Sequence, residues 1–313
     1  MKNVKSMFLS IMAVVLAIGA MGCSASPEAE GATGVKTVTI SHELGDTTVA
    51  LNPERVVVFD YGILDSMKEL GIEVIALPKQ SLPAHLGEFG GMEYIDAGTL
   101  KEPNFEVIYE ASPDLIIVSG RQVDMYDDFA RIAPTVYMPM DNGEYLESLR
   151  NNLNILGQIF DKKEMVDEKV DDIESSIQYL NEIASDRVEN GLFVMANDGN
   201  LSVYGEGSRF GVLHEEFGIP AADREIESST HGQKITFEYI QQIDPEYIFV
   251  MDRAAVAGGE VSAKSVMDNE IIGMTRAYAE GKIIYLDAHV WYVGAGGIGS
   301  TEKMINEIIS AIE

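Results

Sequence analysis

The chain has 313 residues, with 51 acidic residues against 22 lysines and arginines, and its formal net charge is −29. This negative charge disfavours nucleic acid and an anionic bilayer surface as partners, and it favours solubility. The length is enough for about two domains.

The N-terminus has the pattern of a secretory signal. Lys2 and Lys5 precede an apolar stretch over residues 7–20, which is too short to span a membrane. Cys23, directly after Gly22, is the only cysteine of the chain, so it cannot form a disulfide within one molecule. An incidental cysteine is the alternative, but the Gly-Cys pair stands where lipid attachment needs it. We therefore predict a signal peptide over 1–22, lipidation of Cys23 and a flexible tether over 23–34.

The first part of the remaining chain alternates between strand and helix signals. Period-two alternation around a Leu-Gly-Asp turn predicts a hairpin over residues 35–51. The elements expected next are a strand at 55–59, a helix at 62–70, a strand at 73–77, a helix near 124–131 and a strand at 135–138. This order is typical of an α/β lobe.

A long helix follows, because residues 144–184 carry no strand signal. Apolar residues fall on one helical face at spacings of four and three, and they are Val166, Val170, Ile173, Ile177 and Leu180. A helix over about 164–184 would span roughly 30 Å and connect two lobes as a rigid strut. We expect it to allow modest closure rather than a wide hinge motion.

The last part repeats the α/β pattern. Strands are expected at 192–196 and 201–204, followed by a helix that opens at Ser208. Helical segments between 265 and 280, a strand at 282–286 and a final helix over 299–312 complete the second lobe.

An internal repeat relates the two lobes. Residues 104–121 and 236–253 share a cap residue, a Phe, a Glu, a Pro, an apolar run and a terminal Arg, and every paired position is offset by 132. Each copy predicts a helix, a turn and a buried strand. The sequence thus predicts two Rossmann-like α/β lobes, over 35–160 and 188–313, joined by one interlobe helix over 161–187 with a ligand cleft between the lobes.

The candidate ligand-binding residues lie at strand ends and in loops, where open α/β sheets bind ligands. Arg121 and Arg253 close the strands of the two repeat copies, and Arg209 lies in a Gly-rich loop at an expected helix start. Lys101 is a further candidate cation. Trp291, with its neighbour Tyr292, and Tyr61 are candidate aromatic walls, although ordinary packing explains each equally well. Arginine forks favour an anionic, oxygen-rich ligand.

Glu106 and Glu238 open the two repeat helices. A carboxylate in a first helical turn is stabilised by the helix dipole, which explains either residue alone. As a symmetric pair they also offer one carboxylate on each lobe for docking a basic partner.

The sequence gives little support to a metal site or to catalysis. The five histidines have no close ligand spacing, and they are His42, His85, His214, His231 and His289. No nucleophile motif is present either. We therefore expect no metal ligands, no cofactor and no enzyme activity.

These features resemble those of substrate-binding lipoproteins of ABC importers for iron-siderophores, a family with two α/β lobes joined by one long helix. The segments around Arg121, Arg209 and Arg253 are similar to the petrobactin-binding subgroup. The resemblance implies that Glu106 and Glu238 engage arginines of the permease and that the cleft holds an anionic ferric catecholate, which carries its own iron.

We therefore expect a monomeric receptor, anchored by lipid on the outer face of the cell membrane, that delivers a ferric siderophore to an ABC permease. The alternatives are a receptor of this fold for haem, cobalamin or a free metal ion, and a surface α/β enzyme.

Overall fold

The computed structural model describes residues 36–141 and 143–313. The predicted signal peptide, the lipidation site Cys23 and the tether lie outside the described residues. Among the residues described, no helix is both long and apolar enough to cross a membrane.

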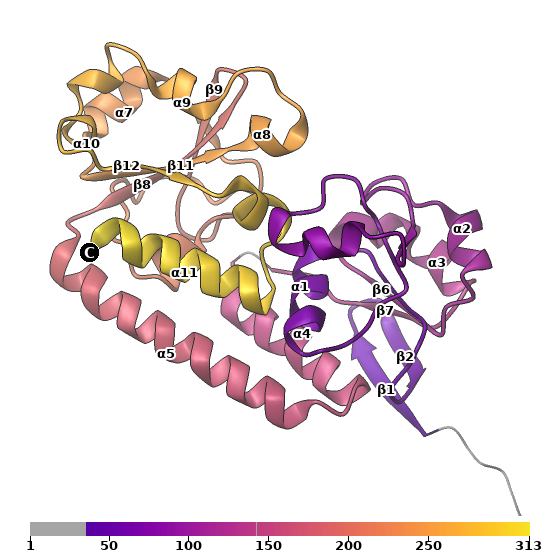
Figure 1. Cartoon of the computed structure of the whole chain (residues 1–313). Helices are drawn as coiled ribbons and strands as arrows, with labels where there is room; N and C mark the ends of the chain where they lie inside the picture. The colour runs from indigo at the N-terminus through magenta and orange to yellow at the C-terminus, as the bar shows by residue number, and fades with distance from the viewer. Residues whose placement is uncertain (1–35, 142) are drawn as a thin grey trace, which may run out of the picture. The chain divides into compact units, whose positions relative to one another are not determined.

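The first lobe is built on a parallel sheet of five short strands (Figure 1). Its strand order is β5-β4-β3-β6-β7, and all neighbouring pairs are parallel. Apolar residues fill both faces of the central strands, as expected for a sheet covered on both sides. The strands are β3 (Val56–Val58), β4 (Ala76–Leu77), β5 (Ile95–Asp96), β6 (Leu115–Val118) and β7 (Thr135–Tyr137). A hairpin of β1 (Thr37–His42) and β2 (Gly45–Ala50) precedes them, as predicted.

The second lobe has a mixed sheet with the order β10-β9-β8-β11-β12. Its β8, β11 and β12 run parallel, whereas β9 and β10 are antiparallel to their neighbours. The strands are β8 (Gly191–Asn197), β9 (Asn200–Tyr204), β10 (Gln233–Ile235), β11 (Tyr247–Asp252) and β12 (Ile283–Leu286). The sequence prediction missed β5 and β10, which are only two and three residues long.

Helices cover both sheets. Those of the first lobe are α1 (Tyr61–Glu69), α2 (Phe105–Glu110), α3 (Tyr126–Ala130) and α4 (Tyr145–Ile159). Those of the second lobe are α6 (Val212–Glu215), α7 (Phe237–Ile243), α8 (Arg253–Ala257), α9 (Ala263–Met267), α10 (Arg276–Ala279) and α11 (Ile298–Ile312). A π-helix, His289–Val293, and a 3-10 turn, Ile272–Met274, lie between these elements.

The repeat has the structure that the sequence predicts. Helix α2 leads into β6 in the first lobe, and α7 leads into β11 in the second. Asn104 caps α2 by accepting a hydrogen bond from the Val107 N–H. Thr236 occupies the cap position of α7, although its side chain makes no capping bond to the described residues. The two copies thus share their fold but not every detail of their helix starts.

Helix α5 (Lys163–Arg187) connects the lobes (Figure 1). Its 25 residues correspond to about 37 Å. The predicted apolar face is confirmed: Val166, Ile173, Ile177 and Leu180 are buried, and Val170 is half-buried. This face packs against α4 and α11.

A second junction holds the lobes together where α1 meets the start of α11. The Asp65 carboxylate accepts a hydrogen bond from the Ser300 N–H at 2.8 Å, and the Ser66 hydroxyl accepts one from the Ile298 N–H at 3.2 Å. Gly62 allows the close approach, because a Cβ at this position would lie 2.5 Å from the Ala295 carbonyl oxygen. The junction therefore depends on small side chains and on one buried carboxylate.

His85 lies beside this carboxylate, with its Nε2 3.5 Å from an Asp65 oxygen and without a hydrogen-bond partner among the described residues. Burial raises the pKa of Asp65 to about 6, although the Ser300 N–H opposes the rise. Burial, together with the charge of Lys303, lowers the pKa of His85 to about 4. The two groups therefore have opposite effects on folding in nearly the same pH range.

We predict opposite pH profiles for the two single variants relative to the wild type, because the difference from the wild type reports the group that is removed. Unfolded His85 binds more protons than native His85, so the free energy of unfolding of His85→Gln should fall relative to that of the wild type as pH rises from about 4 to 6.5. Native Asp65 binds more protons than unfolded Asp65, so the free energy of unfolding of Asp65→Asn should rise relative to that of the wild type as pH rises from about 4 to 6. Each change should amount to about 1 kcal/mol after allowance for solvent screening. Urea unfolding across this range, with the wild type as control, measures the slopes, and parallel profiles for the two variants would contradict the prediction.

Candidate ligand-binding cleft

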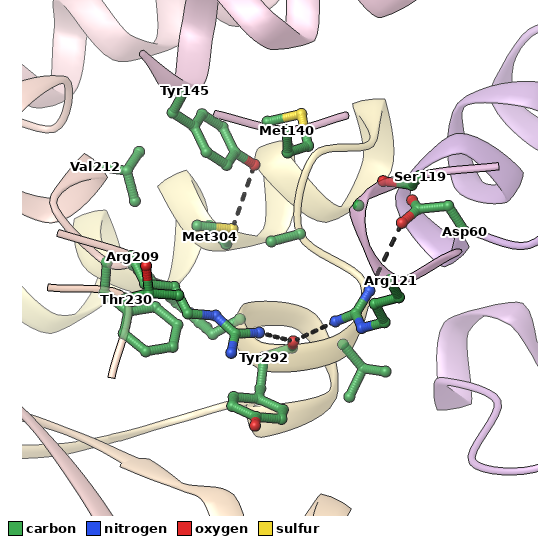
Figure 2. Close-up of a pocket in the computed structure, with 15 residues that line it drawn as sticks. Asp60, Ser119, Arg121, Met140, Tyr145, Arg209, Val212, Thr230, Tyr292 and Met304 are labelled. Atoms are coloured by element: carbon green, nitrogen blue, oxygen red, sulfur yellow. Dashed lines mark hydrogen bonds and ion pairs between the residues drawn. The ribbon is translucent and has the colours of Figure 1, made fainter. Parts of the chain in front are cut away.

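A cavity of about 300 Å³ lies between the two lobes (Figure 2). Asp60 follows the carboxyl end of β3, and Arg121 lies in the 3-10 helix Gly120–Met125 that follows β6, so both residues reach its wall. The second lobe contributes Arg209 from the loop before α6 and Tyr292 from the π-helix. This is the edge at which open α/β sheets bind ligands.

Two arginines from different lobes donate to one carbonyl oxygen in this cavity (Figure 2). The Arg209 Nη2 lies 2.8 Å from the Tyr292 oxygen, and the Arg121 Nη2 lies 3.3 Å from it. Burial lowers the pKa of Arg209, and the charge of Arg121 adds to this effect. The site thus concentrates positive charge in a chain whose net charge is −29.

Tyr292 lies between two guanidinium groups. The Arg209 guanidinium is 4.1 Å from the centre of its ring, and the Arg253 Nε donates to its hydroxyl at 2.9 Å. Burial alone would raise the pKa of the Tyr292 phenol. The bond from Arg253 and the charges of both arginines outweigh burial and hold this pKa below its ordinary value. The phenol oxygen is therefore the acceptor of a charge-assisted hydrogen bond.

Asp60 is the buried acid of the cavity wall. Its Oδ1 accepts hydrogen bonds from the N–H groups of Gly62 and Ile63, which caps α1, and its Oδ2 lies 3.7 Å from Arg121. Burial raises the pKa of Asp60, and the charge of Arg121 opposes the rise. Sequence analysis missed this residue, although an Asp between a buried strand and a helix start is a recognisable cap signal.

Comparison with known proteins identifies the family. The family model described as periplasmic binding protein matches residues 56–290. The chain belongs to this family. It is 39% identical to the petrobactin-binding protein YclQ of Bacillus subtilis, with 100% of both sequences covered. It is 30% identical to the ferric-anguibactin-binding protein FatB of Vibrio anguillarum, with 88% of each covered.

Solved structures show the same similarity. The crystal structure of YclQ matches with a TM-score of 0.86 and 41% identity, over 89% of this chain and 99% of that one. The catecholate-siderophore binding protein VctP of Vibrio cholerae matches with a TM-score of 0.81 and 34% identity, over 88% of this chain and 100% of that one. The predicted fold class, with two α/β lobes, is confirmed.

The structure of this periplasmic binding protein brings together only part of the predicted site. Arg121 and Arg209 line the cavity. Arg253 lies one layer behind, where its Nη1 donates to Asn197 at 3.0 Å and its Nε holds Tyr292. Lys101 is exposed and is not among the residues that line the cavity. Of the four predicted cations, two thus line the cavity, one supports Tyr292 from behind, and one lies on the surface outside the cavity.

The predicted aromatic residues are placed differently from expectation. Trp291 reaches the cavity wall but exposes only 1% of its surface, and its Nε1 donates to Glu307 at 2.8 Å. Tyr61 is likewise 1% exposed, and its hydroxyl donates to the carbonyls of Pro78 and Gln80. Tyr61 therefore packs in the core of the first lobe and is not among the residues that line the cavity. Tyr292 supplies the accessible aromatic face instead.

The environment expected for Arg209 also needs correction. The helix after it begins at Val212 rather than at Ser208 and has only four residues. The positive potential near Arg209 therefore comes from the neighbouring guanidinium groups rather than from a helix dipole. Within the described ranges, no three His, Cys, Asp or Glu side chains lie close enough to hold a metal ion.

Glu106 and Glu238 lie outside the cavity, exposed in the first turns of α2 and α7. Backbone and Thr236 hydrogen bonds lower the pKa of Glu238. Figure 1 shows α2 and α7 on different lobes and away from α5. The two carboxylates are thus available to a partner on a surface separate from the ligand cleft.

We predict that Arg253→Gln raises the pKa of the Tyr292 phenol, because the charged donor that stabilises the phenolate is lost. Carbon-13 NMR of labelled tyrosines across alkaline pH measures the change, with Tyr292→Phe to assign the resonance. Arg131→Gln is the control, because the Arg131 side chain is 73% exposed and lies at the C-terminal end of α3, in the first lobe. An unchanged Tyr292 pKa in Arg253→Gln would contradict this account of the phenol.

Proposed function

We propose that this protein captures an anionic ferric siderophore of the catecholate class in its interlobe cleft and delivers it to an ABC permease. The observation that carries the proposal is the convergence of Arg121 and Arg209, one from each lobe, on a single cavity. A strongly acidic protein that places two arginines side by side in a cavity, with the single carboxylate of Asp60 near one of them, fits an anionic ligand.

The relatives support this ligand class. YclQ is named for petrobactin, FatB for ferric anguibactin and VctP for catecholate siderophores. A siderophore surrounds its own iron, so the receptor needs cations and an aromatic face rather than metal ligands. At an effective dielectric constant near 20, one charge contact at about 4 Å contributes about 4 kcal/mol before desolvation.

The proposal gives different roles to the three arginines, and their contacts support these roles. Arg121 and Arg209 turn their guanidinium donors from the Tyr292 carbonyl to the ligand. Arg253 positions Tyr292 through its bond to the phenol and through Asn197. The cavity volume of about 300 Å³ is at the lower end of the range for small-molecule sites. A ferric siderophore therefore extends out of the cavity or separates the lobes further.

The same proposal covers location and assembly. Lipid on Cys23 anchors the protein at the outer face of the cell membrane, and the protein acts as a monomer that binds and transfers its ligand without catalysis. Glu106 and Glu238 each pair with a basic side chain of the permease. The repeat supports this pairing, since it places one exposed carboxylate at the start of an equivalent helix in each lobe.

The ligand assignment predicts that Arg209→Gln weakens binding of ferric petrobactin by about 10-fold to 100-fold, the loss expected for a hydrogen bond to a charged group. Quenching of the single tryptophan, Trp291, and calorimetry measure the affinity. Arg131→Gln, on the exposed surface, should bind as the wild type does. If wild-type protein binds no ferric catecholate by either method, the assignment is wrong.

The docking assignment predicts that Glu106→Arg combined with Glu238→Arg abolishes uptake and leaves the affinity for ferric petrobactin unchanged, because opposed positive charges repel the permease. Uptake of radiolabelled ferric petrobactin is measured in cells that lack the native gene and receive each variant. The control is Glu168→Arg with Glu182→Arg, at exposed positions of α5. Normal uptake by the Glu106 and Glu238 variant would show that these residues serve only their helix starts.

A further inference from the structure

We propose that each lobe docks through a composite patch, in which the carboxylate is paired with an exposed apolar side chain: Glu106 with Tyr109, and Glu238 with Met274. The partner is the permease, which presents a basic side chain next to an apolar one at each of the two points. This inference rests on the proposed docking function and adds to it the apolar half of the contact.

The first patch lies on α2. Tyr109 follows Glu106 by three residues, which places the two side chains on one face of the helix. The Tyr109 side chain is 70% exposed. Together with Phe105, Asp128 and Ile132, the pair lines an open hollow of about 530 Å³ between α2 and α3. Asp128 already pairs with Arg131, so Glu106 is the carboxylate left beside the ring. An aromatic ring next to a carboxylate suits a guanidinium group, which can stack on the ring and pair with the acid.

The second patch is built from different residues. In the repeat, the position equivalent to Tyr109 is Gln241, which follows Glu238 by three residues on α7. The Gln241 Nε2 lies 3.3 Å from the Sδ of Met274, and Met274 is 66% exposed. The 3-10 turn thus places the apolar side chain of Met274 beside Gln241, the position of α7 that is polar where α2 has Tyr109.

Few large apolar side chains of the described residues are as exposed as Tyr109 and Met274. Of the large apolar side chains in the described ranges, only four expose half or more of their surface, namely Met92, Tyr109, Met274 and Tyr278. Of these four, Tyr109 lies one helical turn from Glu106, and Met274 contacts Gln241, which lies one helical turn from Glu238. Large apolar and aromatic groups next to charge are typical of the residues that carry most of the energy of an interface.

The negative charge of the first patch decides between a second copy of this chain and the permease as its partner. A second copy of this chain, docked on the first patch through a two-fold axis, would bring Glu106 against the same acid of its partner. Such a contact is repulsive in a chain with a net charge of −29. A basic and apolar surface is complementary, and the permease is the partner that meets both lobes at once.

The test compares two double variants. Tyr109→Ser with Met274→Ser should reduce uptake of radiolabelled ferric petrobactin, raising the receptor level needed for half-maximal uptake by about tenfold or more. Its affinity for ferric petrobactin, measured by calorimetry, should match that of the wild type and thereby show that the variant is folded. The matched control removes the same residue types from α5, as Tyr179→Ser with Met165→Ser, which are 48% and 40% exposed in the wild type.

The outcomes separate the two levels of the hypothesis. If the Glu106 and Glu238 variant abolishes uptake but Tyr109→Ser with Met274→Ser does not reduce it, the apolar half is overturned and the docking proposal stands. If neither variant affects uptake, both are overturned. An equal loss of uptake in the α5 control would also overturn the proposed patches. So would a different result for Tyr109→Ser with Met274→Ser: normal uptake, together with loss of a self-association that sedimentation detects in the wild type.

Discussion

The carbonyl oxygen of Tyr292 is the point on which the cleft depends. It lies near the end of a π-helix, where carbonyl groups lack partners within the helix. Arg209 from its own lobe and Arg121 from the other lobe satisfy it together. One backbone acceptor therefore brings two guanidinium groups of like charge together and links the lobes across the cavity.

This arrangement lets the site remain stable without a ligand. Two neighbouring guanidinium groups repel each other, and desolvation adds a cost that shows in the lowered pKa of Arg209. The Tyr292 carbonyl, the Tyr292 ring and Asp60 offset part of that cost, since each presents negative charge or a negative face to an arginine. Binding of an anion is then an exchange, in which ligand oxygens replace a neutral carbonyl as acceptors. Charged acceptors form the stronger hydrogen bonds, so the exchange favours the anion.

The sequence was sufficient to predict the features that depend on local pattern and on the repeat. The 132-residue offset locates α2–β6 and α7–β11, and the spacing from Val166 to Leu180 predicts the face of α5. The sequence could not predict that Arg121 lines the cavity whereas Arg253 does not. The two arginines follow equivalent strands, but different residues pack beside them. Arg253 meets Asn197 and Tyr292 from elsewhere in the second lobe. Neither could it tell Trp291 from its neighbour Tyr292, since the π-helix turns adjacent residues toward the core and the cleft respectively.

The contacts between the lobes also constrain how a bound ligand can change the arrangement of the lobes. Helix α5 packs on α4 and α11, and α11 in turn is held by Asp65 and Ser66 of α1. A wide hinge motion would have to break this buried junction, whereas Arg121 links the lobes across the cleft through a single long hydrogen bond to Tyr292. A ligand that takes over Arg121 therefore changes the contact between the lobes at the cleft and leaves the α1–α11 junction in place. Because α2 and α7 belong to different lobes, even a small rotation about that junction changes the separation of Glu106 and Glu238. Under the proposed docking function, the spacing of the two carboxylates is thus the quantity through which the state of the cleft reaches a partner that binds both lobes.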